Sequence, residues 1–374
     1  MRYPYYAHML DVNDDGAYIL KPCTAPISVK EEGAPCVLGS EETNGLFFAV
    51  TYSEDAIFFN FFHGFCGACG AMPWLKTTIW QYLTDMGYAP SSEGIYTPDS
   101  ALRQGETDLP DCDTFGDELC IGEYTGGDSF LPIADYRAAY RDLDACSRYY
   151  PITIPKDALM KYVSENDGSP NSIISAAMFK MSACLFPDEE QLAARIACNY
   201  RADVGCPNTY RDLVRMLHVK YKKRMKDWTI EKLSTITRGA MFMQMQPELS
   251  RKEYKELMEF RDGIDQCATI DEKRGYAAER SLLHKGPKDT YTISYVGKMD
   301  WGGISEYVTS AFTLTEGHLI VEVNAVENQF CISFMTYGRD AEYLGAFLAV
   351  LEEEGIPYKV GGLEKRNMPK MQLK

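Results

Sequence analysis

Residues 60–70 read Asn60-Phe61-Phe62-His63-Gly64-Phe65-Cys66-Gly67-Ala68-Cys69-Gly70 and join an apolar run to a helix-like segment. The run from Ala56 to Phe62 predicts a strand, and the segment from Ala71 to Leu83 has the pattern of a helix. His63 therefore stands at the exit of a strand, where its side chain can face a cleft. The small residues after it predict that the backbone approaches a substrate closely.

Length and composition indicate a globular protein with two domains. The chain has 374 residues, of which 45% are hydrophobic and 12% aromatic, and one domain usually takes 100 to 200 residues. The net charge of −16 argues against general binding of DNA, RNA or anionic membranes, because these polyanions need a basic surface. An anionic ligand would need a local basic patch.

The first residues and the cysteines suggest a cytoplasmic location. Residues 1–6 lack the pattern of a signal peptide, and no run of about 18 apolar residues occurs, so we expect no transmembrane segment. Twelve cysteines spread over this length do not resemble the dense framework of a small secreted domain. We expect most of them to be reduced and buried.

Turn signals divide the first part of the chain into short strands up to about Ile57. Residues 41–45 are predicted to form a hairpin turn between strands at Cys36–Gly39 and Leu46–Tyr52. A helix is predicted from about Met72 to Met86, with Gly87 as its stop. Residues 90–129 predict a long surface loop, and we place the domain boundary after it, giving domains 1–145 and 146–374.

The second domain is predicted to alternate helices and strands. The expected helices cover Lys156–Glu165, Pro170–Leu185, Thr209–Lys226, Thr229–Met245, Arg251–Asp262 and Ala341–Glu354. The expected strands cover Ala193–Tyr200, Thr290–Val296, Ala311–Thr315, His318–Val326, Gln329–Tyr337 and Tyr358–Val360. The fold class is therefore mixed α/β.

The His63 region resembles the CoA-dependent acyltransferase superfamily, which includes chloramphenicol acetyltransferase, alcohol acetyltransferases and nonribosomal peptide condensation domains. The alcohol acetyltransferases carry a pattern close to Phe-His-x-x-x-Asp-Gly-x-Gly-x-x-x-Phe-Leu-Lys, and this chain has Phe62-His63, Gly70 and Trp74-Leu75-Lys76. The Asp-Gly pair is replaced by Gly67-Ala68. That aspartate mainly organises the loop in the family, so its replacement puts the loop geometry in question.

Two further segments match the same superfamily in the same order. Residues 293–297, Ile-Ser-Tyr-Val-Gly, resemble the family strand whose serine contacts the oxyanion, which implies that role for Ser294; an ordinary strand serine is the alternative. Asn199-Tyr200-Arg201 is similar to a family strand that ends in arginine, and we take Arg201 as structural. Asp300-Trp301-Gly302-Gly303 resembles a family turn only superficially.

The resemblance implies two chloramphenicol acetyltransferase-like subdomains with a tunnel between them. Because residues 2–4 resemble the end of the family's first helix, the N-terminal subdomain is expected to be abridged. His63 would act as general base and Ser294 as oxyanion donor, with Gly67, Gly70 and Tyr295 lining the tunnel.

The implied reaction is transfer of an acyl group from a CoA or carrier-protein thioester to a hydroxyl or amine. The thioester would be a co-substrate, and no permanently bound cofactor is expected. The partners would be a small-molecule acceptor and, in one version, a carrier protein. A catalytically weak or inactive acyltransferase-like binding protein is the alternative, because the aspartate is replaced.

Two other features allow different interpretations. Cys66 and Cys69 have the spacing of a redox or zinc motif, but no second ligand pair has suitable spacing, so no metal is expected. The basic run from His218 to Lys226 fits either the phosphates of a CoA or carrier arm or a solvated helix face.

Overall fold

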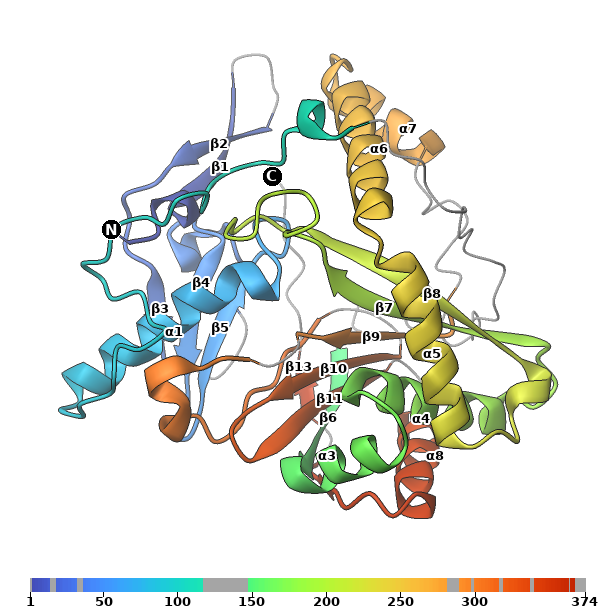
Figure 1. Cartoon of the computed structure of the whole chain (residues 1–374). Coiled ribbons are helices and arrows are strands. Elements are labelled where there is room, and N and C mark those ends of the chain that lie inside the picture. The colour runs from blue at the N-terminus through green and yellow to red at the C-terminus, as the bar shows by residue number, and fades with distance from the viewer. Residues whose placement is uncertain are drawn as a thin grey trace.

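The computed structural model describes residues 2–13, 18–31, 36–116, 147–280, 289–296, 299–315, 319–336, 340–362 and 364–366. Within these ranges the strands form one large sheet and two smaller ones, as Figure 1 shows. The strands are β1 (His8–Val12), β2 (Tyr18–Pro22), β3 (Ser28–Lys30), β4 (Phe48–Tyr52), β5 (Ile57–Phe61), β6 (Ser147–Pro155), β7 (Gln191–Asn199), β8 (Val214–Lys222), β9 (Tyr291–Tyr295), β10 (Ile320–Ala325), β11 (Gln329–Thr336), β12 (Lys359–Val360) and β13 (Glu364–Arg366).

Helices cover mainly the large sheet. The α-helices are α1 (Ala68–Asp85), α3 (Lys156–Glu165), α4 (Pro170–Leu185), α5 (Ile230–Gln244), α6 (Pro247–Asp265), α7 (Ile270–Arg280) and α8 (Asp340–Glu353). The 3-10 helices are η1 (Pro4–Tyr6), η2 (Glu41–Thr43), η3 (Cys112–Thr114), η4 (Lys223–Met225) and η6 (Gly302–Tyr307). None of the helices in the described ranges is both long and apolar enough to cross a bilayer.

The large sheet has the order β12-β6-β11-β10-β9-β7-β8, with β13 also paired to β6. β9 runs parallel to both of its neighbours, β10 and β7, and the other pairs are antiparallel. Helices α3, α4, α5 and α8 lie on one face (Figure 1) and bury a mostly aliphatic core against it. Side chains alternate along each strand, so the opposite face of β9, β10 and β11 can carry other residues.

The N-terminal region has a different kind of core. β3, β4 and β5 form a small sheet beside α1, and the buried cluster between them is rich in tyrosine, phenylalanine and tryptophan. Tyr6 donates its hydroxyl hydrogen to the Gly70 carbonyl at 2.6 Å, and Tyr3 donates to that of Pro73 at 2.8 Å. Each ring thus buries apolar area while its polar tip finds a partner.

A turn at 300–303 joins the two regions. Lys76 of α1 donates to the Asp300 carbonyl at 2.9 Å, and Trp301 Nε1 donates to the Ala325 carbonyl at the end of β10 at 3.2 Å. Gly303 N donates to the Glu93 carbonyl at 2.8 Å, and a Cβ on either Gly302 or Gly303 would collide with that segment's backbone. The turn that sequence analysis treated as a superficial match is thus the contact between α1 and the large sheet.

Most predicted elements of the second domain are confirmed, and the predicted mixed α/β class is confirmed with them. α3 and α4 have the predicted bounds, and the Ser169 side chain caps α4 by accepting from Ser172 N. Helix α1 begins at Ala68, four residues before the predicted start, so the small residues after Gly67 belong to a helix and not to a loop. The predicted domain boundary at 145/146 lies outside the described residues.

Three predicted elements are wrong. Residues 214–222 form strand β8 and not part of a helix, because the buried residues alternate with period two. Residues 36–39 are not a strand: Asn44 and Gly45 adopt positive φ as predicted, but β4 pairs in parallel with β3 instead. Residues 311–315 form no ladder, and the N–H groups of Ala311 and Thr315 contact the sulfurs of Cys331 and Met335.

Candidate active site

His63 lies in the turn between β5 and α1. The turn is closed by a hydrogen bond from Phe65 N to the Phe62 carbonyl at 3.0 Å, and both rings pack on Phe47. This aromatic packing fixes the backbone on each side of His63 and leaves its imidazole 63% exposed. The sequence prediction of an accessible histidine at a strand exit matches this placement.

The imidazole faces a carboxylate from a distant part of the chain. His63 Nδ1 lies 3.4 Å from Asp212 Oδ2. Asp212 comes two residues before β8 and is 30% exposed at its side chain. The hydrogen bond to Asp212 raises the pKa of His63, and the charge of Glu322 raises it further. Sequence analysis missed Asp212, since nothing local to residues 209–213 identifies a partner for a histidine in the other region.

Neighbouring residues leave no room for a side chain at Gly67 or Gly70. A Cβ on Gly67 would fall inside van der Waals distance of Asp212 Oδ1, with Asp212 Cγ 3.3 Å away. A Cβ on Gly70 would collide with the Tyr210 carbonyl and lie 2.9 Å from Cys66 Cβ. The structure therefore places both glycines against the 209–212 segment, and the predicted tunnel-lining role is not what requires their size.

Ser294 lies on the face of the large sheet opposite the helices. It pairs in register with Glu322 of β10, and Glu322 pairs with Ser333 of β11. Ser294 donates a hydrogen bond to the Glu322 carboxylate, and Thr315 Oγ1 lies 3.5 Å from Glu322 Oε1. Ser333 Oγ is buried and has no hydrogen-bond partner among the described residues. Ser294, Glu322 and Ser333 thus form a polar row across β9, β10 and β11.

Glu322 connects this row with His63. Burial raises the pKa of Glu322 to about 7, while the Ser294 hydrogen bond and the charge of His63 each lower it. The mutual effect of the two charges means that His63 and Glu322 lie within Coulombic reach. His63 therefore acts electrostatically on the carboxylate that accepts from Ser294. Sequence analysis missed Glu322, although a lone carboxylate inside the run Leu319–Val323 was an available signal.

Tyr295 does not share this face. It follows Ser294 in β9, so its side chain points to the opposite side, where it packs against the aliphatic core with its ring centre 6.5 Å from that of Phe330. The structure does not bring Tyr295 together with His63 and Ser294. Gly297, the end of the predicted motif, lies outside the described residues.

Arg201 is buried and holds the loop that carries Asp212. Its guanidinium donates to the carbonyls of Thr209 (3.0 Å) and Arg211 and to Asn199 Oδ1 (3.0 Å). These bonds pin both sides of the 201–211 loop. The geometry agrees with a structural role and shows what Arg201 supports.

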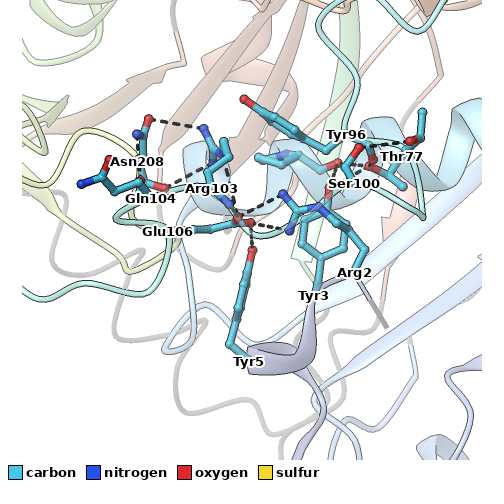
Figure 2. Close-up of polar contacts among 12 residues, drawn as sticks. Arg2, Tyr3, Tyr5, Thr77, Tyr96, Ser100, Arg103, Gln104, Glu106 and Asn208 are labelled. Atoms are coloured by element: carbon cyan, nitrogen blue, oxygen red, sulfur yellow. Dashed lines mark hydrogen bonds and ion pairs between the residues drawn. The ribbon is translucent and has the colours of Figure 1, made fainter.

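A second network ties the same loop to the N-terminus, as Figure 2 shows. Glu106 accepts two 3.0 Å hydrogen bonds from the Arg2 guanidinium and one from the Tyr5 hydroxyl. Its carbonyl accepts from Tyr210 N at 2.9 Å, and the Tyr210 ring stacks on Tyr5 with centroids 4.1 Å apart. The segment before Asp212 is therefore held by the aromatic core of the N-terminal region.

The two cysteines after His63 have the properties of packing residues. Burial raises the pKa of the Cys66 thiol to about 12 and also raises that of Cys69. Reactive thiols usually have a lowered pKa, so neither is activated as a nucleophile. No disulfide joins the cysteines of the described residues, and no group of three or more metal-ligating side chains occurs there.

The basic run lies on β8 and η4, so the proposed helix face does not exist. His218 Nδ1 contacts Asp289 Oδ1 at 2.9 Å, and Lys223 Nζ lies 3.5 Å from Glu190 Oε1. Two members of the run are therefore paired with carboxylates. This reduces the positive charge that it offers to a phosphate.

No protein-family model and no curated protein matches the chain. Solved structures do match. TRI101 of F. sporotrichioides, complexed with coenzyme A and T-2, is 12% identical and has a TM-score of 0.55, with 96% of this chain and 88% of that chain covered. TRI101 of F. graminearum, complexed with coenzyme A and T-2 mycotoxin, is 12% identical and has a TM-score of 0.56, with the same coverage of both chains.

A structure of a condensation domain also matches. That of the enacyloxin polyketide synthase, described as mediating chain release, is 11% identical with a TM-score of 0.50, covering 94% of this chain and 72% of that chain. These identities support statements about the fold alone. The chain has the mixed α/β, two-subdomain fold of the chloramphenicol acetyltransferase-like and condensation-domain structures, as the resemblance of its motifs implied.

Proposed function

We propose that the chain is an acyltransferase that moves an acyl group from a CoA or carrier-protein thioester to a hydroxyl or amine. The observation that carries the proposal is the electrostatic influence between His63, an exposed imidazole, and the buried Glu322, which pairs in register with Ser294 in the large sheet. Support comes from the fold, because TRI101 structures with that fold were solved with coenzyme A.

In this mechanism His63 acts as the general base. The imidazole takes the proton from the acceptor O–H or N–H as the acceptor attacks the thioester carbonyl carbon. The tetrahedral intermediate then collapses, the C–S bond breaks, and the imidazolium returns a proton to the leaving thiolate. No covalent enzyme intermediate is needed.

Ser294 is the proposed oxyanion donor, and the protonation of Glu322 affects whether it can donate. An ionised Glu322 accepts the Ser294 hydroxyl hydrogen, whereas a neutral Glu322 donates its own hydrogen and leaves that of Ser294 for the oxyanion. Because the pKa of Glu322 is raised to about 7, both forms are populated near neutral pH. The carboxyl and the serine therefore act as one unit in this proposal.

The test measures thiol release from acetyl-CoA and longer acyl-CoA thioesters with a panel of alcohols and amines. We expect His63→Ala to lower kcat/KM by about 10² to 10⁴ and Ser294→Ala by about 10² to 10³. The control is His8→Ala, which should leave the rate unchanged. His8 lies on β1, and its Nδ1 contacts the Tyr5 carbonyl at 3.1 Å.

Two outcomes would count against the proposal. Unchanged turnover in His63→Ala would remove the catalytic assignment. Absence of thioester consumption by the wild type across the whole panel, together with measurable binding of CoA, would favour the alternative of an acyltransferase-like binding protein. A carrier-linked thioester in the same panel distinguishes the two donor classes.

A further inference from the structure

Asp212 occupies the space that a side chain at position 67 would need. A Cβ on Gly67 collides with Asp212 Oδ1 and lies 3.3 Å from Cγ and 3.7 Å from Val214 Cγ2. The other carboxylate oxygen, Oδ2, lies 3.4 Å from His63 Nδ1. One carboxylate therefore fills the gap beside Gly67 with one oxygen and meets the imidazole with the other.

The contact between His63 and Asp212 contributes too little to the free energy of unfolding to account for its presence. An ion pair with side chains 63% and 30% exposed contributes about 0–1 kcal/mol, because water screens it. The backbone before Asp212 is nevertheless held in place. Arg201 donates to the carbonyl of the preceding Arg211, and the Tyr210 ring stacks on Tyr5. The adjacent position 67 carries no side chain to displace it. The loop holds Asp212 in a fixed position, and the ion pair that Asp212 makes with His63 adds little stability. Such an arrangement can orient the His63 imidazole.

We propose that Asp212 is the positioning residue of His63 and supplies, from the loop before β8, the carboxylate that the His63 turn itself lacks. Its Oδ2 accepts the hydrogen of Nδ1, which fixes the tautomer with the lone pair on Nε2 and turns that nitrogen toward the acceptor. Asp212 touches neither substrate nor reacting atoms. The inference rests on the proposed function for its catalytic consequence, but the His63–Asp212 contact can be measured without a substrate.

The arrangement predicts an effect on pH dependence. Among the described residues, the charges that act on His63 come from Asp212 and from Glu322 on β10, while Asp212 and Arg201 act in opposite directions on the pKa of the Cys66 thiol. A negative neighbour favours the imidazolium, so the pKa of His63 is raised, and only the neutral form serves as a base. Activity should therefore rise with pH through the pKa of His63 and fall again as Glu322 ionises and takes the Ser294 hydrogen.

The experiment compares wild type, Asp212→Asn and the control Asp271→Asn in the full chain. Asp271 is an exposed carboxylate of α7 with 95% side-chain exposure, and its replacement removes the same charge far along the chain from His63. The His63 imidazole is titrated by NMR, and the rate of thiol release is measured from pH 5 to 9.

In Asp212→Asn we expect the midpoint of the His63 titration and the acidic limb of the pH–rate profile to move together to lower pH. The plateau of kcat should fall by about 10- to 100-fold with a smaller change in KM, because a loosely held base is misplaced. In Asp271→Asn both curves should match wild type. A residue that only packs the loop would change neither midpoint.

Gly67→Ala gives a second approach that keeps the carboxylate. Its methyl group must push Asp212 Oδ1 away, so the same downward shift of the His63 midpoint is expected. In an Asp212→Ala background the same methyl group meets no carboxylate, and Gly67→Ala should then leave the midpoint unchanged. In a chain that keeps Asp212, Gly67→Asp places two carboxylates in one space, so the simple restoration of the family pattern should reduce activity.

The outcomes separate the two proposals. If the titration shifts in Asp212→Asn while no variant, including wild type, consumes a thioester, the His63–Asp212 pair stands and the proposed function fails. If His63→Ala abolishes acyl transfer but Asp212→Asn leaves the titration midpoint and pH–rate profile unchanged, the proposed function stands and the inference is wrong.

Discussion

Two buried glutamates, one in each region of the molecule, have opposite electrostatic environments. Glu106 in the N-terminal region meets the Arg2 guanidinium in a bidentate pair, whereas Glu322 in the large sheet has hydroxyl partners and only the exposed His63 as a cation acting on it among the described residues. Burial alone would raise both pKa values. The hydrogen bonds from Arg2, Tyr5 and Arg103 N reverse this for Glu106, whose pKa is lowered, while the pKa of Glu322 is raised to about 7.

The difference shows how each region uses a buried charge. In the N-terminal region the carboxylate ties together the chain terminus, an aromatic core and the loop before Asp212. In the large sheet the Glu322 carboxyl lies beside Ser294 with no buried cation acting on it in the described part of the chain, and burial raises its pKa. Strongly shifted pKa values of this kind are common at functional sites.

The largest expected effect is the loss of Glu106. Glu106→Ala leaves the Arg2 guanidinium buried without its carboxylate and the Tyr5 hydroxyl without its acceptor, and we expect the free energy of unfolding to fall by about 3–5 kcal/mol. Urea denaturation measures the loss. Hydrogen exchange should show reduced protection first in β4, α1 and residues 200–213 rather than in the large sheet.

Glu165→Ala is the control for the first prediction. Glu165 pairs with Lys161 at 3.9 Å on α3, where both side chains are exposed, and we expect a change below about 1 kcal/mol. Equal losses in the two variants would contradict the contrast drawn above. A double replacement, Arg2→Met with Glu106→Leu, should recover part of the stability, because no charge is then left buried.

The second expected effect is the pH dependence contributed by Glu322. Its folded pKa lies above the unfolded value, so the folded state binds more protons and its contribution to stability is present below about pH 4.5 and lost as pH rises through 7. The rise in pKa from 4.5 to about 7 corresponds to about 3 kcal/mol. Glu322→Gln should therefore be more stable relative to wild type at pH 8 than at pH 4.

The control repeats the comparison of Glu322 with Glu322→Gln in a His63→Ala background, because the pKa of His63 is also raised and gives a slope of the same sign. Unfolding midpoints in urea from pH 4 to 8 supply the measurement. Glu106 should act oppositely: its contribution is present above its unfolded pKa and lost as pH falls. Parallel pH curves for wild type and Glu322→Gln would show that burial of Glu322 carries no such penalty.

The smallest expected effect concerns the cysteines. Cys66 is fully buried, so Cys66→Ala should cost about 1 kcal/mol of stability, while Cys69→Ala, at a partly exposed position, should cost less than about 0.5 kcal/mol. Equilibrium unfolding of the two single variants measures this. Thiol–disulfide exchange by the wild type that disappears in the double variant would instead restore the redox interpretation.

Local patterns are sufficient to predict much of the fold. Helix α4 is predicted with its bounds because Ser169 caps it and Pro170 opens it, both signals within a few residues. Strand β8 is not predicted, because the helix expected over Thr209–Lys226 overlooks the period-two alternation that the structure shows at Val214–Lys222. Helix α7 is also missed, since its sequence is mostly charged and polar and its few apolar residues show little helical periodicity.

The site is less accessible to sequence analysis. His63 and Ser294 can be proposed because each stands in a short motif, but their partners Asp212 and Glu322 arrive through tertiary structure. The small size of Gly67 suggests close approach of a substrate, whereas the structure places Asp212 against it. Tyr295 does not line a shared site with Ser294, because strand alternation puts it on the opposite face.

The contact between the N-terminal aromatic core and Tyr210 also has a consequence for synthesis on the ribosome. At about 5–20 residues per second, His63 leaves the ribosome on the order of ten seconds before Tyr210 and Asp212 are made. During that interval Tyr5 and Tyr6 lack the ring that covers them, and Glu106 lacks the backbone N–H of Tyr210. A nascent or prematurely terminated chain that stops before residue 210 should therefore expose this aromatic surface and become a substrate for chaperones and proteases.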